Sequence, residues 1–359
     1  MEQVVDSIVG HLERKPICAV LAPDEKFLEV AAKVAHRLNL PHNRLESLKT
    51  SVNKVLARTL LSRSDVLVPE FWTIELDGDL AAQMSEVQYP CVAKPINLSA
   101  SRGVIRADND TQLVQAIQRI RDLLRIESGS ELEQPILVER YIPGSEHSLE
   151  GYLSNGELET VCIFDKPQPL DGPYFEEIYF VTPSIVDEPV QEKIHESVLK
   201  ACQAYGLQTG PVHAEVRVNN SQVWILEVAA RSIGGDCARL FELATNSSLE
   251  QFILCKSAGQ STRRPQFQRA CGVAMMPISA KGVLRRIEGV IDAQAVEGVL
   301  DVRIDVRAGE KLTPLPEGGK YPGFIYAEAD TPALAEISLR EALSNIKFVC
   351  MPELPVTVK

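Results

Sequence analysis

The alternation of apolar and polar residues predicts helices and strands interleaved along the whole chain. Apolar residues recur at helical spacing in residues 2–15, 24–40, 45–64, 111–127, 189–207, 236–259 and 331–346. Short apolar or alternating runs bounded by Pro, Gly and Asn predict strands at residues 17–22, 89–95, 102–108, 135–141, 148–154, 158–164, 176–182, 212–218, 223–229, 271–279, 282–289, 299–306 and 323–330. This order, with much antiparallel pairing, is typical of an α/β or α+β fold.

Composition narrows the class of protein. The chain has 359 residues and a formal net charge of −12, which argues against a general nucleic-acid binder. Eight cysteines occur without any Cys-x-x-Cys pair, and the N-terminus does not resemble a signal peptide. No apolar run approaches membrane-spanning length. We therefore expect a cytoplasmic protein with reduced thiols and no membrane partner.

Two neighbouring strands, residues 212–218 and 223–229, each carry one glutamate within an apolar pattern. Alternation puts Glu215 on the same face as His213. If residues 220–222 form a three-residue turn, Glu215 lies directly opposite Glu227, with the side-chain bases about 5 Å apart. An even-length turn instead places the two glutamates on opposite faces.

Opposed carboxylates are unfavourable in a sheet unless a cation lies between them, and oxygen ligands of this kind suit Mg²⁺. The alternative is a solvated face of an edge hairpin. Arg231 and a turn containing Gly234 follow the second strand. An arginine can hold phosphate or carboxylate with two donors, and glycine lets backbone N–H groups approach an anion. The sequence therefore predicts a site for metal-bound phosphate chemistry.

A second candidate phosphate site lies upstream. Lys94 ends an apolar strand, and the loop "NLSASRG" follows with Ser99, Ser101 and Gly103. A lysine beside a loop of small residues is a plausible phosphate clamp. Lys54, on the preceding predicted helix, is a second candidate, although a lone helical lysine is usually solvated.

In this order, the segments resemble the ATP-grasp superfamily of carboxylate–amine ligases. The branch containing bacterial L-amino-acid ligase and carnosine synthase is the most similar, through "SASRGVIRAD", "ILVERYIPGSE", "FEEIYFVTPS" and "EVAARSIGGD". The resemblance implies an ATP-grasp fold in which two α+β subdomains, residues 51–136 and 137–262, grip ATP. It also implies a shortened N-terminal α/β segment, residues 1–50, and a small C-terminal α+β domain, residues 270–359.

The resemblance implies a set of nucleotide contacts, which are Lys54, Lys94, Ser99, Ser101, Gly103, Glu139, Tyr141, Ile142 and Glu146. The two lysines would contact the α- and β-phosphates, and the serines and Gly103 would lie in the loop that closes over them. Glu139 and the backbone of Tyr141 and Ile142 would read adenine. Glu146 would hold the ribose hydroxyls.

The remaining roles concern the metal and the reacting groups. Glu215 and Glu227 would hold Mg²⁺ or Mn²⁺, whereas Arg231 and the backbone of Gly234 would steady the acyl-phosphate and the tetrahedral intermediate. His213 would touch the reacting group or, equally well, be a packed histidine.

The implied activity is ATP-dependent ligation of a small-molecule carboxylate to an amine, most simply two amino acids, through an acyl-phosphate. Residues 164–177 are expected to form a wall of the substrate pocket, with Lys166 and Glu177 as contacts.

One alternative function is that of a biotin-carboxylase-like enzyme. Another is a catalytically degenerate ATP-binding regulatory module, favoured by the short N-terminal segment and by Ala229, where the family often has Asn. The protein could act as a monomer or as a homodimer.

Overall fold

The computed structural model describes residues 1–12, 15–128 and 134–352. The chain divides into two compact units. Unit 1 comprises Met1–Phe71, Ile142–Asp165 and Ser184–Gln268, and unit 2 comprises Trp72–Tyr141, Lys166–Pro183 and Arg269–Lys359. Residues 13–14 of the expected first helix and residues 353–359 of the expected C-terminal domain lie outside the described residues.

Unit 1 contains four neighbouring antiparallel strands in the order β6-β5-β8-β9. Its elements, in chain order, are α1 (Glu2–Leu12), the 3-10 helix η1 (Glu25–Phe27), α2 (Leu28–Arg37), α3 (Leu45–Val52), α4 (Lys54–Leu61), β5 (Ser145–Ser154), β6 (Glu157–Lys166), α7 (Glu188–Tyr205), β8 (Gly210–Asn219), β9 (Gln222–Ala229), α8 (Cys237–Thr245) and α9 (Leu249–Ser257).

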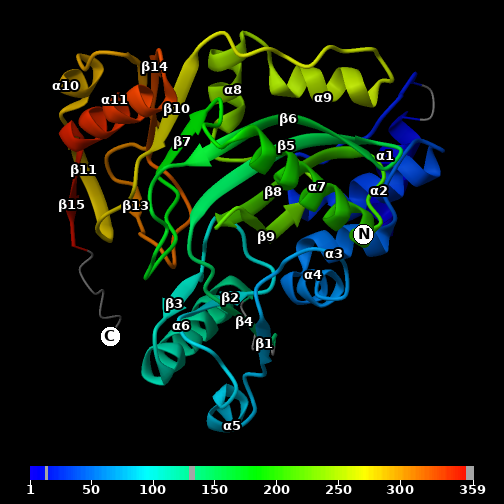
Figure 1. Ribbon diagram of the computed structural model, residues 1–359, viewed down its shortest axis with the longest axis horizontal. Helices are drawn as coiled ribbons and strands as arrows, with labels where there is room; N and C mark the ends of the chain where they lie inside the picture. The colour runs from blue at the N-terminus through cyan, green and yellow to red at the C-terminus, as the bar shows by residue number, and fades with distance from the viewer. Residues whose placement is uncertain (13–14, 129–133, 353–359) are drawn as a thin grey trace. The chain divides into compact units, whose positions relative to one another are not determined.

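One face of these strands is apolar and carries the core of unit 1. Helix α7 packs against β9 on this face, and α4 packs against α7 (Figure 1). The core includes Leu149, Ile194, Val198, Val216 and Ile225. Each such fully buried side chain contributes about 1.5–3 kcal/mol relative to an exposed one. Since strand side chains alternate, burying this face turns the intervening polar side chains to the opposite face.

Two of the predicted helices are each two helices. Residues 45–64 break at Asn53, whose side chain accepts from Val55 N and Leu56 N at 3.1 and 3.0 Å and so begins α4. Residues 236–259 break between Asn246, which has a φ of 54°, and Ser248, which caps α9. Asn and Ser side chains satisfy the orphan N–H groups of a new helix, and helical periodicity does not reveal such breaks.

The strand predicted at residues 17–22 is absent. Among the described strands, none pairs with this segment, and an isolated extended segment is not stable in water.

The turn between β8 and β9 also differs from the prediction. Asn219 pairs with Gln222, so the turn has two residues, Asn220 and Ser221, with φ of 49° and 59°. Such left-handed pairs are typical of tight hairpins.

Glu215 nevertheless lies opposite Glu227, as predicted. The register shifts between Glu215 and Val216, since Val216 pairs with Ile225 whereas Glu215 pairs with Glu227. Leu226 is the extra residue of this β-bulge, and it compensates for the shorter turn.

Unit 2 contains three groups of neighbouring strands, in the orders β1-β4-β2-β3, β12-β14-β10-β7 and β13-β11-β15. Helix α6 packs on β2 and β3, whereas α11 packs on β10 and β14 (Figure 1). The elements are β1 (Phe71–Ile74), α5 (Leu80–Met84), β2 (Cys91–Pro95), β3 (Ile105–Ala107), α6 (Asp110–Ser128), β4 (Ile136–Arg140), β7 (Tyr179–Thr182), β10 (Ala270–Met275), β11 (Gly282–Glu288), α10 (Val290–Gln294), β12 (Val299–Ile304), β13 (Lys311–Leu312), β14 (Gly323–Ala329), α11 (Pro332–Asn345) and β15 (Lys347–Met351).

The fold is mixed α/β, as the hydrophobic pattern predicts. Among the described helices, none combines the length and apolar character needed to cross a membrane. All eight cysteines are free thiols.

Candidate active site

The polar face of β5, β8 and β9 carries most of the residues singled out in unit 1. Cross-strand pairing arranges them in three rows, which we call the polar ladder: Glu146 and Arg217; Ser148, Glu215 and Glu227; Glu150 and His213. Directly opposed residues share a face and lie about 4.5–5.5 Å apart at Cβ, so strand register alone brings these side chains together.

Helix α4 fixes the β-bulge that aligns the middle row. Arg58 is 3% exposed and donates to the carbonyl oxygens of Ile225 and Leu226, both at 2.8 Å. Lys54 lies one turn earlier on this helix, and its Nζ is 3.5 Å from both carboxylate oxygens of Glu227. Lys54 therefore contacts the ladder. It is not the solvated lysine that its position on a helix would also have allowed.

A buried pair occupies the third row. Glu150 Oε1 lies 2.5 Å from His213 Nδ1, and Glu150 Oε2 accepts from Ile233 N at 2.9 Å. His213 Nε2 lies 3.6 Å from Glu215. Burial alone lowers the pKa of His213, but the carboxylates of Glu150 and Glu215 outweigh it and raise the pKa to about 9. The imidazole thus supplies a buried positive charge at neutral pH, consistent with a packed histidine.

Glu146 is also tied into the ladder. Its Oε2 accepts from Arg217 Nε at 2.9 Å, and Arg217 Nη1 donates to Ile142 O at 2.7 Å. A carboxylate oxygen of Glu146 lies within 4.8 Å of one of Glu215. The predicted ribose contact is therefore also a neighbour of the predicted metal ligands, which the sequence did not indicate.

The middle row has the chemistry of a hard-cation site. The side chains of Glu215 and Glu227 are 25% and 26% exposed, so each is sheltered but reachable. Ser148 Oγ, in the same row, is buried and has no hydrogen-bond partner among the described residues. Carboxylate and hydroxyl oxygens are suitable ligands for Mg²⁺ or for its bound water. The residues present therefore fit a divalent cation.

The turn after β9 brings Arg231 to a partner that the sequence did not reveal. Glu25 of η1 accepts from Arg231 Nη2 at 2.7 Å and from Nε at 2.9 Å, and Arg231 Nη1 donates to Ser232 O. Burial alone lowers the pKa of Arg231, but Glu25 and the nearby ladder carboxylates raise it. The guanidinium is held as a charged group beside the ladder.

Gly234 lies two residues after Ser232, in the turn that leads into α8. Open space surrounds the position that a Cβ would take there. Gly235 and Asp236 follow with φ of 63° and 61°, and α8 begins at the next residue. A glycine turn at a helix N-terminus can present N–H groups to an anion.

Unit 2 places Lys94 and Glu139 together. They lie on the paired strands β2 and β4, form an ion pair, and their side chains are 12% and 3% exposed. Tyr141 follows Glu139 by two residues and donates through its hydroxyl to Asp171 Oδ1 at 2.6 Å. Its N–H donates to Pro90 O at 2.9 Å, so this group is engaged within the protein.

The predicted phosphate loop, residues 97–103, has an unusual backbone. Ala100, Ser101 and Gly103 have φ of 55°, 54° and 71°. Non-glycine residues rarely adopt this left-handed conformation, and it is enriched at functional sites. The loop thus has a specific, strained shape.

The expected substrate contacts Lys166 and Glu177 form an ion pair with each other. Lys166 Nζ also lies 5.3 Å from the ring centroid of Phe180.

Comparisons with known proteins identify both parts of the chain. The ATP-grasp domain matches residues 87–239, and the L-amino acid ligase C-terminal domain 2 matches residues 274–351. The alanine–anticapsin ligase of Bacillus subtilis strain 168 is 27% identical over 249 residues, covering 65% of this chain and 52% of that protein. Dapdiamide A synthase of Enterobacter agglomerans is 23% identical over 365 residues, covering 96% and 82%.

The crystal structure of L-amino acid ligase from Bacillus licheniformis matches with a TM-score of 0.80 at 25% identity, covering 98% of this chain and 85% of that chain. Residues 87–239 therefore form an ATP-grasp domain, and the relatives that this chain resembles are named as ligases and a synthase. The chain also has the C-terminal domain 2 of the L-amino acid ligases, and the two domain matches together confirm the resemblance. It spans about half the length of the alanine–anticapsin ligase.

Proposed function

We propose that the protein joins the carboxylate of one amino acid to the amine of another through an acyl-phosphate, with Mg²⁺ or Mn²⁺ at Glu215 and Glu227. The reaction is ATP + carboxylate + amine → ADP + phosphate + amide. The opposed glutamates beside Lys54, in a chain with these two domains, are the observation that carries the proposal. The names of the relatives, an alanine ligase and an L-amino acid ligase, support amino-acid substrates.

In the first step a substrate carboxylate oxygen attacks the γ-phosphorus, and the bond to the ADP oxygen breaks. Lys54 and Lys94 neutralise the triphosphate and orient it for in-line attack. A divalent ion, when bound, further neutralises charge on the phosphate oxygens. Residues 97–103 keep water away from the acyl-phosphate, which would otherwise hydrolyse. Glu139, the backbone of Tyr141 and Ile142, and Glu146 hold the nucleoside.

In the second step the amine attacks the acyl carbon, phosphate leaves, and the amine loses a proton. Arg231 and the backbone N–H at Gly234 stabilise the oxyanion of the tetrahedral intermediate. His213 contributes fixed positive charge next to Glu215, because its raised pKa makes it a poor base at neutral pH.

A phosphate-release screen of amino-acid pairs with ATP and Mg²⁺ tests the proposal. We expect Glu227→Gln and Arg231→Ala to fold and to lose at least about 100-fold in turnover, the scale typical of lost transition-state electrostatics. Glu157→Gln, at an exposed position in β6, is the matched control and keeps wild-type turnover. Wild-type phosphate release by Glu227→Gln would contradict the metal assignment.

A catalytically degenerate ATP-binding module is the second candidate. Ala229, fully buried opposite His213, cannot supply the side-chain oxygen that the family often has there. ATP binding without substrate-stimulated phosphate release would favour this candidate. Biotin-dependent ATP cleavage with bicarbonate would instead favour a biotin-carboxylase-like enzyme.

We also propose that the protein lies in the cytoplasm. Its eight cysteines are all free thiols, which is typical of proteins in a reducing compartment.

A further inference from the structure

A segment of the C-terminal domain, residues 314–320 between β13 and β14, contacts the phosphate loop within unit 2. Gly103 N donates to Pro316 O at 2.9 Å, and Arg102 Nε donates to Glu317 O at 3.1 Å. A Cβ on Gly319 would lie 2.6 Å from Arg102 Cδ, so glycine permits this close approach. The C-terminal end of the loop is therefore attached to the backbone of this segment.

The side chain of Glu317 attaches the same segment to helix α6. Its two oxygens accept from Arg119, from Nε at 2.5 Å and from Nη2 at 2.9 Å. Two parallel bonds fix the relative orientation of guanidinium and carboxylate, which a single surface ion pair does not. The hydrogen bond from Arg119 lowers the pKa of Glu317, so the pair is charged at neutral pH.

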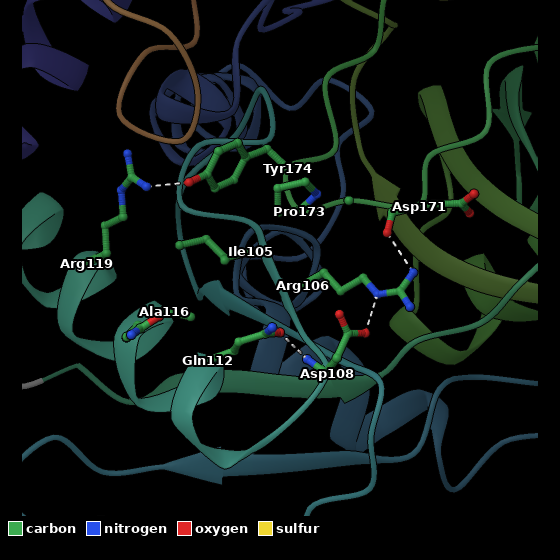
Figure 2. Close-up of a pocket in the computed structure, with 11 residues that line it drawn as sticks. Ile105, Arg106, Asp108, Gln112, Ala116, Arg119, Asp171, Pro173 and Tyr174 are labelled. Atoms are coloured by element: carbon green, nitrogen blue, oxygen red, sulfur yellow. Dashed lines mark hydrogen bonds and ion pairs between the residues drawn. The ribbon is translucent and has the colours of Figure 1, made fainter.

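Arg119 also reaches the segment expected to form the substrate wall. Its Nη1 is hydrogen-bonded to the hydroxyl of Tyr174, and its Cζ lies 5.2 Å from the ring centroid (Figure 2). A pocket of about 390 Å³ lies between α6 and residues 171–174, with Arg119 and Tyr174 at one end (Figure 2). Arg119 is therefore a polar link between Tyr174 and α6, in addition to the apolar core on which Tyr174 packs.

We propose that Glu317 and Arg119 are positioning residues of the ligase, bracing the phosphate loop and the substrate wall against the C-terminal segment. The inference rests on the proposed function. An acyl-phosphate survives only while water is excluded, so a loop that loses its brace admits water. Phosphate is then released without amide formation. The C-terminal domain thereby contributes to coupling, although neither residue touches the reacting atoms.

The test compares Glu317→Gln with Glu288→Gln, which removes a charge from an exposed Glu288–Arg286 pair in the same unit. We expect Glu317→Gln to raise the ratio of phosphate released to amide formed about five-fold. This is the fold-change that corresponds to the strongest exposed ion pairs. The KM for ATP should rise and kcat change little. Glu288→Gln should behave as the wild type. The charge-swapped double variant Arg119→Glu/Glu317→Arg should recover part of the coupling.

A second measurement does not require turnover. Hydrogen exchange of the amides of residues 98–104 should be faster in Glu317→Gln than in the wild type or in Glu288→Gln. If no substrate pair supports turnover, the proposed function fails, whereas faster exchange still supports the brace. Unchanged exchange together with an unchanged phosphate-to-amide ratio would overturn the inference.

Discussion

In the proposed function the polar ladder and the phosphate loop both serve nucleotide chemistry, but they are held in place by different forces. The ladder lies on three antiparallel strands. Buried Arg58 fixes the register of β9 through its hydrogen bonds to the β-bulge. The phosphate loop has left-handed residues at Ala100, Ser101 and Gly103 and is attached to residues 316–317 by two hydrogen bonds.

This difference matches the role that we propose for each region. Metal ligands must hold their geometry through the reaction, and strand register with buried hydrogen bonds provides that rigidity. A loop that closes over phosphate would also have to open, and a small number of attaching contacts keeps the free energy of opening low. Substitutions that weaken the ladder should therefore reduce stability, whereas those in the loop should mainly change kinetics.

The largest expected effect is on the ladder, through Arg58→Met. Loss of the guanidinium leaves the carbonyl oxygens of Ile225 and Leu226 buried without their donor. We expect the free energy of unfolding to fall by about 3–5 kcal/mol, because two hydrogen bonds from a charged donor are lost, at about 1.5–3 kcal/mol each. Denaturant unfolding measures this change.

Arg63→Met is the control, since Arg63 is exposed just after the same helix and should change stability by less than about 0.5 kcal/mol. Equal stability of the two variants would show that Arg58 does not fix the bulge.

The next effect concerns Lys94 and Glu139. Lys94→Met should weaken ATP binding about 10- to 100-fold through loss of a charge-assisted phosphate contact. It should also destabilise the fold, because it leaves the buried Glu139 carboxylate without this cation. The double variant Lys94→Met/Glu139→Gln should regain stability but not ATP affinity. Calorimetric ATP binding and thermal unfolding separate the two effects, and recovery of affinity in the double variant would exclude a phosphate role for Lys94.

The sequence predicted the ladder's central row, because both glutamates lie in strands whose alternation is visible locally. The turn length was wrong, yet the opposition of Glu215 and Glu227 was right. The bulge at Leu226 depends on Arg58, which is 167 residues from Ile225 in the chain. Similarly, Glu25 is 206 residues from Arg231, and Glu317 is 198 residues from Arg119. No local pattern identifies such distant partners.

The fold class was also predictable, because the hydrophobic periods of most elements are clear. The breaks at Asn53 and Ser248 were not predicted, since the apolar spacing continues across both residues and only their capping hydrogen bonds end one helix and begin the next. Residues 347–351 form β15 by pairing with β11, and a strand that depends on a distant partner has a weak signal of its own.

A smaller effect on the ladder depends on pH. The folded-state pKa of His213 is about 9, above its ordinary value of 6.5, so the protonated histidine stabilises the fold. This contribution is complete below pH 6.5 and is lost as the pH rises through 9. The difference in unfolding free energy between wild type and His213→Gln should therefore shrink by about 3 kcal/mol between pH 6 and pH 10, at roughly 1.4 kcal/mol per pKa unit. A difference that grows with pH would contradict the assigned charge.

The smallest effect is expected in the phosphate loop, from Gly103→Ala. Gly103 has a φ of 71°, and a Cβ there would lie 3.0 Å from the Pro95 ring and 3.3 Å from Leu123. Alanine costs about 1–2 kcal/mol in this conformation. Because the loop can relax locally, we expect the KM for ATP to rise about five-fold and the global unfolding transition to change little.

Gly309→Ala separates backbone strain from steric contact. Gly309 has a φ of 94°, but no atom lies within 4 Å of the position that a Cβ would take. It should therefore lose comparable local stability without a change in the KM for ATP. If Gly103→Ala instead lowered the global stability as much as Arg58→Met, the loop would be as rigidly integrated as the ladder. The ladder and the phosphate loop would then contribute equally to global stability, and the proposed difference in their rigidity would be wrong.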